Sequence, residues 1–402
     1  MESALGWTQI ARSDVAKAAE LLKGEEGVRD EIGFLTLHQG FADRFFPGTS
    51  VLQTRLRYAL FVPWQIEDLE RHPRAGSFTA EQRLRAAERR LVRRLKDAGD
   101  GVIGRRSKDY DPAQPPSTIY WTALRLWGIL NPTAPGIWPG RTEVLGRIDA
   151  SRRSDDRPEG GTRLSESTFF ALPERPEDWD SDAPLSFHLP SKEKRYVLER
   201  IQEVKRIAPG SEGEESLLSR LAKSQKRPPS WLKAGYETPI LKKLADAEDR
   251  EALDQAIAAA SLAHIGRAAY SALVESMAKA DGRKTKGHFA HALKRIVAQR
   301  KKSALACDLG AVESLIEPLE WRFRAALEST LDWLRKSESD VMALWKPYCA
   351  SEEWRKTRRA RLAKSAHAES LRTAWIASDV PEAQPLNYRW HRVGQLLDDL
   401  HG

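Results

Sequence analysis

The stretch TAEQRLRAAERRLVRRLKDAG, residues 79–99, has the clearest pattern in the chain and predicts how its surroundings fold. Thr79 and Gln82 stand at the spacing of a capping box, in which each side chain binds a backbone N–H at the start of a helix. Gly99 is a typical residue just after a helix end. We therefore expect a helix from Ala80 to Ala98. Its apolar face recurs at three- and four-residue intervals and consists of Leu84, Ala87, Leu91 and Leu95.

The other face of this expected helix carries a row of cations. Arg85, Arg89, Arg93 and Lys96 lie at positions i, i+4, i+8 and i+11, with Arg83, Arg90 and Arg94 alongside. Only Glu88 interrupts the row, whereas a merely solvated face usually mixes both signs of charge. From Arg83 to Lys108 there are ten basic and three acidic residues, a local net charge of +7. We expect contact with phosphate groups. The alternatives are a solvated face or a docking surface for an acidic protein.

Upstream of this helix lies the segment FFPGTSVLQTRLRYALFVPW, residues 45–64. Pro47-Gly48 suits the centre of a type II turn, and Ser50 with Gln53 predicts a helix that begins at Val51. Proline lacks an N–H, so we expect Pro63 to end this helix. Its polar face is predicted to hold Gln53, Thr54 and Arg57. The segment is either a well-capped core helix or a helix that presents Gln53, Arg55 and Arg57 to phosphate or to a partner.

Downstream, a loop adds the cations Arg105, Arg106 and Lys108 and leads into PPSTIYWTALRLWGIL, residues 115–130. Ser117 suits an N-cap and Gly128 a helix end, so a short helix is expected. Its bulky face of Tyr120, Trp121, Leu124 and Trp127 would be buried, which leaves Thr118, Thr122 and Arg125 exposed. A basic helix, a turn, a short helix and a Pro/Gly-rich turn follow in the order of a winged helix-turn-helix unit. A small helical domain with no role in DNA binding shows the same order.

The whole chain reads as a mainly α protein. Its 402 residues are 41% hydrophobic and 30% charged, and helical spacing dominates from end to end. We expect an N-terminal winged-helix-like nucleic-acid-binding domain over residues 1–150 and a helical C-terminal domain over residues 187–402. The stretch between them, residues 151–186, is rich in Pro, Gly and charge and is expected to be an irregular connection.

The C-terminal part predicts long helices over residues 248–279, 288–302, 312–335 and 352–375. The segment EEWRKTRRARLAK, residues 352–364, is a second basic stretch. Trp354 in this stretch either stacks on a nucleic-acid base or, as is more common, anchors the helix to the core.

Signals for catalysis and metal binding are weak throughout. The patterns GxxxxGK[ST] and GxSxG do not occur. His288 and His291 are spaced i, i+3 without the glutamate of a zinc-protease motif, and His264 lies among apolar residues. Cys307 and Cys349 are far apart and form no zinc pattern. We expect no catalytic residue, no metal and no cofactor.

The sequence also predicts where the protein works. Its first residues lack a basic region followed by an apolar one, and no run of 18 apolar residues occurs. Two isolated cysteines favour a reducing compartment. We expect a cytoplasmic protein without a membrane partner. The excess of 65 Lys and Arg over 57 Asp and Glu is compatible with an anionic partner.

Four segments together resemble a known family. They are FADRFFPGTSVLQTRLRYALFVPW (41–64), STIYWTALRLWGI (117–129), SLAHIGRAAYSALVE (261–275) and NYRWHRVGQLLDDL (387–400). They resemble the bacterial domain-of-unknown-function family six-three-six-one, whose members are full-length proteins of about this size. The resemblance implies a place in antiviral defence neighbourhoods, beside helicase-type ATPases and phospholipase D-like nucleases. It supplies no catalytic residues.

Our leading hypothesis is a non-enzymatic DNA-binding or adaptor subunit of an anti-phage defence system. The protein would hold nucleic acid, DNA in preference to RNA, for a helicase-type ATPase or a phospholipase D-like nuclease from the same locus. One alternative is a structural scaffold whose basic helix receives an acidic partner, and another is a cryptic metal-dependent nuclease whose carboxylates meet only in the fold. The predicted nucleic-acid-binding residues are Arg55, Arg57, Arg85, Arg89, Arg90, Arg93, Arg94, Lys96, Arg105, Arg106, Lys108, Thr118, Thr122 and Arg125.

Overall fold

A computed structural model of the chain describes residues 30–73, 77–154, 167–210, 213–224, 239–336 and 340–401. Over these residues the fold is mainly α, as the sequence predicts. No strand occurs in this part of the chain, where β pairing is limited to isolated bridges such as Leu130 with Phe169.

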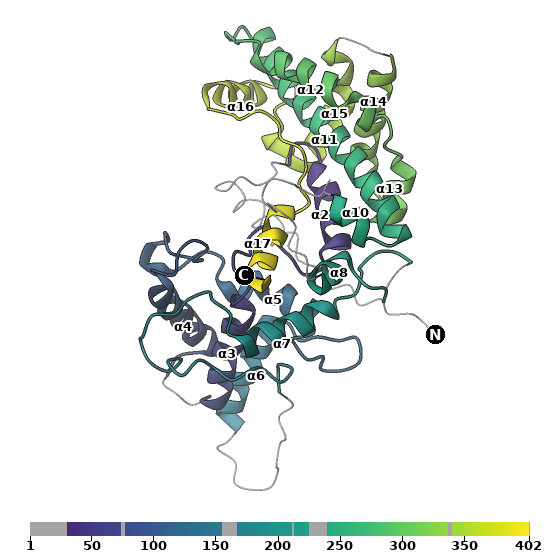
Figure 1. Cartoon of the computed structure of the whole chain (residues 1–402). Helices are drawn as coiled ribbons and strands as arrows, with labels where there is room; N and C mark the ends of the chain where they lie inside the picture. The colour runs from purple at the N-terminus through teal and green to yellow at the C-terminus, as the bar shows by residue number, and fades with distance from the viewer. Residues whose placement is uncertain are drawn as a thin grey trace, which may run out of the picture. The chain divides into compact units, whose positions relative to one another are not determined.

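The α-helices are α2 (Phe34–Phe45), α3 (Tyr58–Arg71), α4 (Ala80–Leu95), α5 (Pro116–Leu126), α6 (Arg141–Ser154), α7 (Ser191–Gln202), α8 (Leu217–Lys223), α10 (Pro239–Leu244), α11 (Ala247–Ala280), α12 (His288–Ala304), α13 (Leu309–Leu315), α14 (Trp321–Lys336), α15 (Trp345–Lys356), α16 (Ala366–Ala377) and α17 (Trp390–His401) (Figure 1). The short 3-10 turns are η1 (Lys108–Tyr110), η2 (Val341–Leu344) and η3 (Thr357–Arg359).

The chain divides into two compact units. The α4 unit comprises residues 42–251 and 388–402, and the α14 unit comprises residues 252–387 with the chain up to Phe41. Helix α6, which ends inside the predicted connection 151–186, and α7, which follows it, both belong to the α4 unit. These units therefore divide the chain at other places than the predicted domains 1–150 and 187–402.

Helix α3 forms the centre of the α4 unit. Ten of its residues are buried, and Phe61 and Trp64 contact the indole of Trp179, with ring centroids 6.0 and 5.3 Å apart. Trp179 therefore anchors the irregular stretch 167–190 to the core. The predicted helix from Val51 was wrong, because residues 51–57 form turns and α3 begins at Tyr58. Pro63 does not end the helix either. It lies inside α3, where burial of the surrounding apolar side chains offsets one missing backbone hydrogen bond.

Helix α17 completes the core of the α4 unit. Trp390 contacts Phe46 with ring centroids 5.8 Å apart, and the α17 side chains Val393, Leu396 and Leu397 are buried. The turn that precedes α3 has the predicted form, since Thr49 N–H donates to Phe46 carbonyl (3.1 Å) and Gly48 has a φ of 81°. A positive φ at the third position of a turn is the reason why glycine is favoured there.

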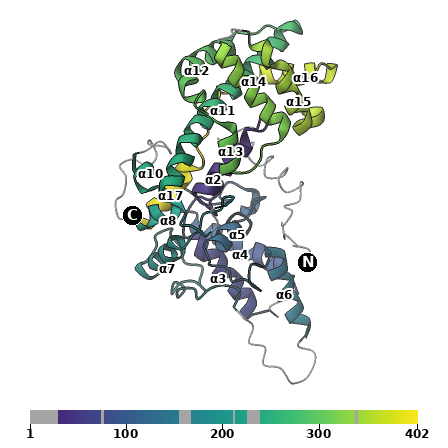
Figure 2. The ribbon, with the colours of Figure 1, turned by 90° about the vertical axis from the view of Figure 1, so that its right-hand side faces the viewer.

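In the α14 unit, α12, α14 and α15 gather around α11 (Figures 1 and 2). Helix α11 is long and apolar enough to cross a membrane by length and composition, but 94% of its apolar window is buried within the protein. Gly266 lies at a close approach, because a Cβ there would stand 2.6 Å from the Phe34 ring and 3.0 Å from the Tyr348 hydroxyl.

Two of the helices predicted in this unit are interrupted in the structure. The stretch 312–335 is divided between α13 and α14, and residues 316–320, which include Pro318, form the break. The stretch 352–375 is divided between α15 and α16, where Thr357 has a φ of 47°. The helices predicted over 248–279 and 288–302 are present as α11 and α12.

Candidate nucleic-acid interface

Helix α4 begins with the capping box that the sequence predicts. Thr79 Oγ1 accepts a hydrogen bond from Gln82 N–H (3.3 Å), and Gln82 Oε1 accepts one from Thr79 N–H (3.0 Å). Asp149 of α6 accepts a third N–H, that of Ala80, at 2.8 Å. Leu84, Leu91 and Leu95 are buried as predicted. This packing fixes which cations of α4 face outward.

Of the predicted row of four cations, Arg93 and Lys96 are exposed, and Arg85 and Arg89 are half-buried. Arg85 Nη2 lies 2.9 Å from one oxygen of Asp111, and Arg89 Nη1 lies 3.5 Å from the other. Asp111 therefore neutralises part of the charge of two arginines. The guanidinium of Arg93 makes no hydrogen bond or ion pair with any residue that the structure describes.

Arg90 and Arg94, which were expected beside this row, bind groups in residues 178–183. Arg94 is 7% exposed and donates hydrogen bonds to the carbonyls of Asp178, Trp179 and Ala183 at 2.6 to 2.8 Å. Arg90 Nε lies 2.7 Å from Asp182, and Arg90 Nη2 donates to the Asp180 carbonyl at 3.0 Å. The prediction that Arg94 lies on the exposed face was wrong, because this side chain fastens the stretch 178–183 to α4.

Arg83 likewise binds the backbone before α4. Its guanidinium donates hydrogen bonds to the carbonyls of His72 (2.6 Å) and Pro73 (3.0 Å). The charge available on the face of α4 is therefore smaller than the sequence count of cations suggests.

Glu88 does not interrupt the cationic row, because its side chain faces the interior. It is 2% exposed, and its Oε1 accepts the Ser117 N–H at 2.9 Å. This contact makes Glu88 a capping group for the first turn of α5. Ser117, the predicted N-cap, is itself inside α5, which follows Pro115. Burial raises the pKa of Glu88 to about 7.

The loop of residues 96–115 connects α4 to α5. Arg106 and Lys108 are exposed, and their side chains make no hydrogen bond or ion pair with the described residues. Arg105 Nη1 donates to the Gly99 carbonyl at 2.8 Å. On α5, Thr118 and Thr122 are exposed and Arg125 is half-buried. A helix-turn-helix unit joins its helices by three or four residues. Because this loop is much longer, the structure does not confirm the winged helix-turn-helix arrangement.

The loop also contains a glycine spacing that the sequence analysis missed. Gly99, Gly101 and Gly104 follow the pattern GxGxxG and have φ values of 89°, 92° and 89°. In dinucleotide-binding folds this pattern follows a strand and opens a helix. Here it follows helix α4, and a Cβ at Gly101 would stand 2.7 Å from the Arg55 side chain. The glycines therefore serve a tight loop that packs against residues 54 and 55.

Arg55 and Arg57, both proposed as phosphate contacts, bind carboxylates of the α4 unit. Arg55 Nη2 lies 2.7 Å from Asp399 of α17. Arg57 is 4% exposed and binds Glu193 of α7 through two hydrogen bonds of 2.7 and 2.6 Å. Gln53, at 1% exposed, donates to the Gly48 carbonyl at 2.9 Å. The prediction that Gln53 and Arg57 are exposed was wrong, because the segment before α3 has no helical face to present them.

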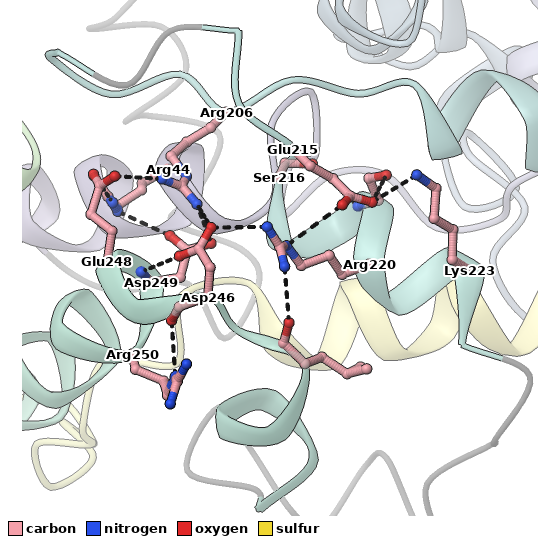
Figure 3. Close-up of polar contacts among 12 residues, drawn as sticks. Arg44, Arg206, Glu215, Ser216, Arg220, Lys223, Asp246, Glu248, Asp249 and Arg250 are labelled. Carbon is pink, nitrogen blue, oxygen red and sulfur yellow. Dashed lines mark hydrogen bonds and ion pairs between the residues drawn. The ribbon is translucent and has the colours of Figure 1, made fainter.

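Three carboxylates do converge in the α4 unit, at the start of α11 (Figure 3). Each of them faces arginines. Arg206 lies 2.5 Å from Asp246, 2.8 Å from Glu248 and 3.0 Å from Asp249. Arg44 of α2 lies 2.6 Å from Glu248, and Arg220 of α8 lies 2.9 Å from Asp246. The carboxylates are thus charge-compensated by the chain itself, and the cluster ties α2, α8 and the start of α11 together.

The histidines and cysteines form no common site. His264 is 8% exposed and its Nε2 lies 2.9 Å from the Ala383 carbonyl, so it is a core residue, in keeping with its apolar neighbours in the sequence. Both cysteines are buried and free. Among the residues that the structure describes, no group of three or more His, Cys, Asp or Glu side chains is arranged to hold a metal ion.

A comparison with protein families matches residues 3–187 to a family of unknown function, DUF6361. Over these residues, fewer than half of the chain, the sequence is similar to this family. The match includes α2 to α6 and thus the whole of α4, its loop and α5. It confirms the family that the sequence resembles, over residues 3–187. Two of the four segments that carried the resemblance, 261–275 and 387–400, lie outside the DUF6361 match. Comparisons with curated proteins and with solved structures found no match.

Proposed function

We propose that the chain binds DNA through the exposed face of α4 and the loop that follows it, and that it acts as a non-enzymatic adaptor. The observation that carries this proposal is the group of Arg93, Arg106 and Lys108. All three are exposed, and none makes a side-chain hydrogen bond or ion pair with the described residues. Unpaired cations close together in the chain are suited to replacing the counterions of a phosphate backbone.

The remaining cations of the row reinforce this group. Arg85 and Arg89 share the single carboxylate of Asp111, and the side chain of Lys96 is 62% exposed. Partly exposed ion pairs of this kind contribute on the order of 1 kcal/mol or less, so a phosphate can displace Asp111 at small cost. Arg57 and Arg94 are left out of the proposed contact surface because their side chains are buried.

The adaptor role and its setting rest on the family resemblance. It implies a place beside helicase-type ATPases and phospholipase D-like nucleases in antiviral defence. A protein that held DNA for such a motor or nuclease would need a sequence-independent phosphate contact, and a cationic helix face supplies one. Pull-down of the proteins encoded at the same locus, with and without nuclease treatment, tests whether DNA bridges the partners.

The decisive experiment compares two variants that lose equal charge. The first carries Arg93→Gln, Arg106→Gln and Lys108→Gln. The control carries Lys192→Gln, Arg195→Gln and Lys205→Gln, which are also exposed residues of the α4 unit. Fluorescence anisotropy with a labelled duplex should show a loss of affinity in the first variant alone. Equal losses would mean that only the net charge matters, and no binding by the parent chain would favour a scaffold for an acidic protein.

The non-enzymatic part of the proposal has its own test. Purified protein incubated with Mg²⁺ or Mn²⁺ and labelled duplex or single-stranded DNA is expected to leave the substrate intact. Cleavage that one carboxylate substitution abolishes would establish a nuclease and overturn the adaptor role.

A further inference from the structure

The α14 unit carries two exposed tryptophans that share one arginine. Trp321 is 66% exposed and Trp354 is 53% exposed. The guanidinium carbon of Arg322 lies 4.1 Å from the centroid of the Trp321 ring and 4.4 Å from that of the Trp354 ring. Of the two interpretations of Trp354, anchoring of α15 to the core does not fit this exposure.

Glu320 fixes the position of Arg322. Glu320 Oε2 accepts the N–H groups of Arg322 (3.0 Å) and Phe323 (3.1 Å), and its Oε1 accepts a hydrogen bond from Arg322 Nη1 at 2.9 Å. Glu320 thus caps the first turn of α14 and fixes the guanidinium. A contact between the Thr330 and Tyr348 hydroxyls (2.9 Å) joins α14 to α15, so both tryptophans project from packed helices.

The contacts of the described residues in this unit do not explain why both indoles are exposed. Tryptophan buries more apolar surface than other residues when it packs, and exposed tryptophans are usual where a partner supplies the other side of the contact. Arg322 does not make this surface strongly polar. Its guanidinium is planar and weakly hydrated, and it stacks on the two rings.

The charge next to the tryptophans is positive. Arg358 and Arg359 lie in η3, directly after α15. They are exposed, and their side chains make no hydrogen bond or ion pair with the described residues. The exposed acid beside Trp354 is Glu353. From Glu352 to Lys364 the stretch holds six basic and two acidic residues. Aromatic faces beside unpaired cations are complementary to a polyanion whose bases are free to stack, whereas the bases of a duplex are already stacked on one another.

We propose that Trp321 and Trp354 form a stacking platform for the bases of single-stranded DNA, with Arg358 and Arg359 as phosphate contacts. This inference rests on the proposed function for its partner class, and it adds a second surface with a different specificity. The surface on α4 would bind the phosphates of duplex or single-stranded DNA. The platform on α14 and α15 would bind unpaired bases. Such a platform would let an adaptor hold the strand that a helicase-type partner exposes.

The test uses the full chain and a labelled dT20 oligonucleotide in anisotropy titrations. Replacing both tryptophans by alanine should weaken dT20 binding about 30-fold or more, since each base stacked on an aromatic ring contributes strongly. Trp→Phe at both positions should retain most of the affinity, and Trp→Leu at both positions should not, because leucine keeps apolar surface but offers no ring. Ile137→Ala with Trp138→Ala, at another exposed apolar site, serves as the control.

Two further measurements separate this platform from the α4 surface. The tryptophan variants should bind duplex DNA like the parent, and Arg358→Gln with Arg359→Gln should reduce the salt slope for dT20 by about 1.4. Unchanged dT20 binding by the alanine variant would overturn the platform while α4 still accounted for duplex binding. Leucine variants that bind dT20 like the parent would also overturn the platform, because they would show that binding requires no aromatic ring. A parent chain that binds dT20 through the tryptophans but does not bind duplex through α4 would retain the platform and refute the proposed α4 surface.

Discussion

The guanidinium of Arg57 binds both carboxylate oxygens of Glu193, at 2.7 and 2.6 Å, across 136 positions of sequence. Each side chain is 5% exposed. Arg57 also donates to the Ser186 carbonyl at 2.8 Å. These contacts join the segment before α3 to α7. Arg57, which the sequence suggested as a phosphate contact, is therefore part of the core of the α4 unit.

Loss of Arg57 should therefore destabilise the chain strongly. Arg57→Gln leaves Glu193 buried without a counter-charge, which costs about 3 to 5 kcal/mol. The midpoint of urea unfolding should fall accordingly, whereas the exposed Arg93→Gln should change stability by about 0.5 kcal/mol or less. The pair Arg57→Met with Glu193→Leu should recover much of the loss, because no lone charge remains. Equal midpoints for Arg57→Gln and Arg93→Gln would show that this ion pair does not stabilise the fold.

Glu88 should make the stability of the protein depend on pH. Burial raises its pKa to about 7 in the folded chain, above the ordinary value of 4.5 that applies when the chain unfolds. Between these values the folded chain keeps a proton that the unfolded chain has released, so the free energy of unfolding falls as the pH rises. The contribution of this group, fully present below about pH 4.5, decreases by about 3 kcal/mol by pH 7 and above.

Glu88→Gln isolates this contribution. Glutamine keeps an oxygen that can accept the Ser117 N–H, and it carries no titratable proton. The difference in unfolding free energy between variant and parent should grow in favour of the variant from pH 5 to pH 8, as measured by urea unfolding at each pH. A difference that stays constant over this range would contradict the raised pKa.

The two cysteines should be unreactive while the chain is folded. Burial raises the pKa of Cys307 and of Cys349 to about 12. Since the thiolate is the reactive form, labelling at pH 8 by a disulfide reagent should be about 1000-fold slower than that of free cysteine. Two thiols should react after denaturation. Rapid labelling of the native chain would show that the α14 unit opens locally.

Sequence patterns predicted correctly those features of α4 that depend on residues close together in the chain. The capping box of Thr79 and Gln82 involves residues three apart, and α4 begins where this pattern places it. Apolar spacing likewise predicted Leu84, Leu91 and Leu95 as its buried face. The same reasoning failed at Pro63, because the cost of one missing hydrogen bond is local whereas the apolar burial that offsets it comes from tertiary packing.

The candidate site was harder to predict for a related reason. Whether an arginine faces solvent depends on partners far away in sequence. Arg94 meets carbonyls of residues 178–183, and Glu88 meets the N–H of Ser117. No periodicity in the basic stretch encodes these partners. The exposed face of Arg93 was predictable, since it lies opposite the apolar stripe of its own helix.

Asp111 provides the last and most specific test of the α4 surface. Its carboxylate lies 2.9 Å from Arg85 and 3.5 Å from Arg89, so it competes with phosphate for both arginines. Asp111→Asn removes the competing charge and should raise affinity for duplex DNA about 2- to 5-fold while steepening the slope of log affinity against log salt by about 1 to 2, at about 0.9 per phosphate contact. Glu174→Gln is the matched control, because Glu174 pairs with Lys192 outside the row. Both variants change the net charge equally, so an equal gain from the two would assign the effect to overall charge. A gain from Asp111→Asn alone would assign it to Arg85 and Arg89, and no gain from either would mean that DNA does not reach this face of α4.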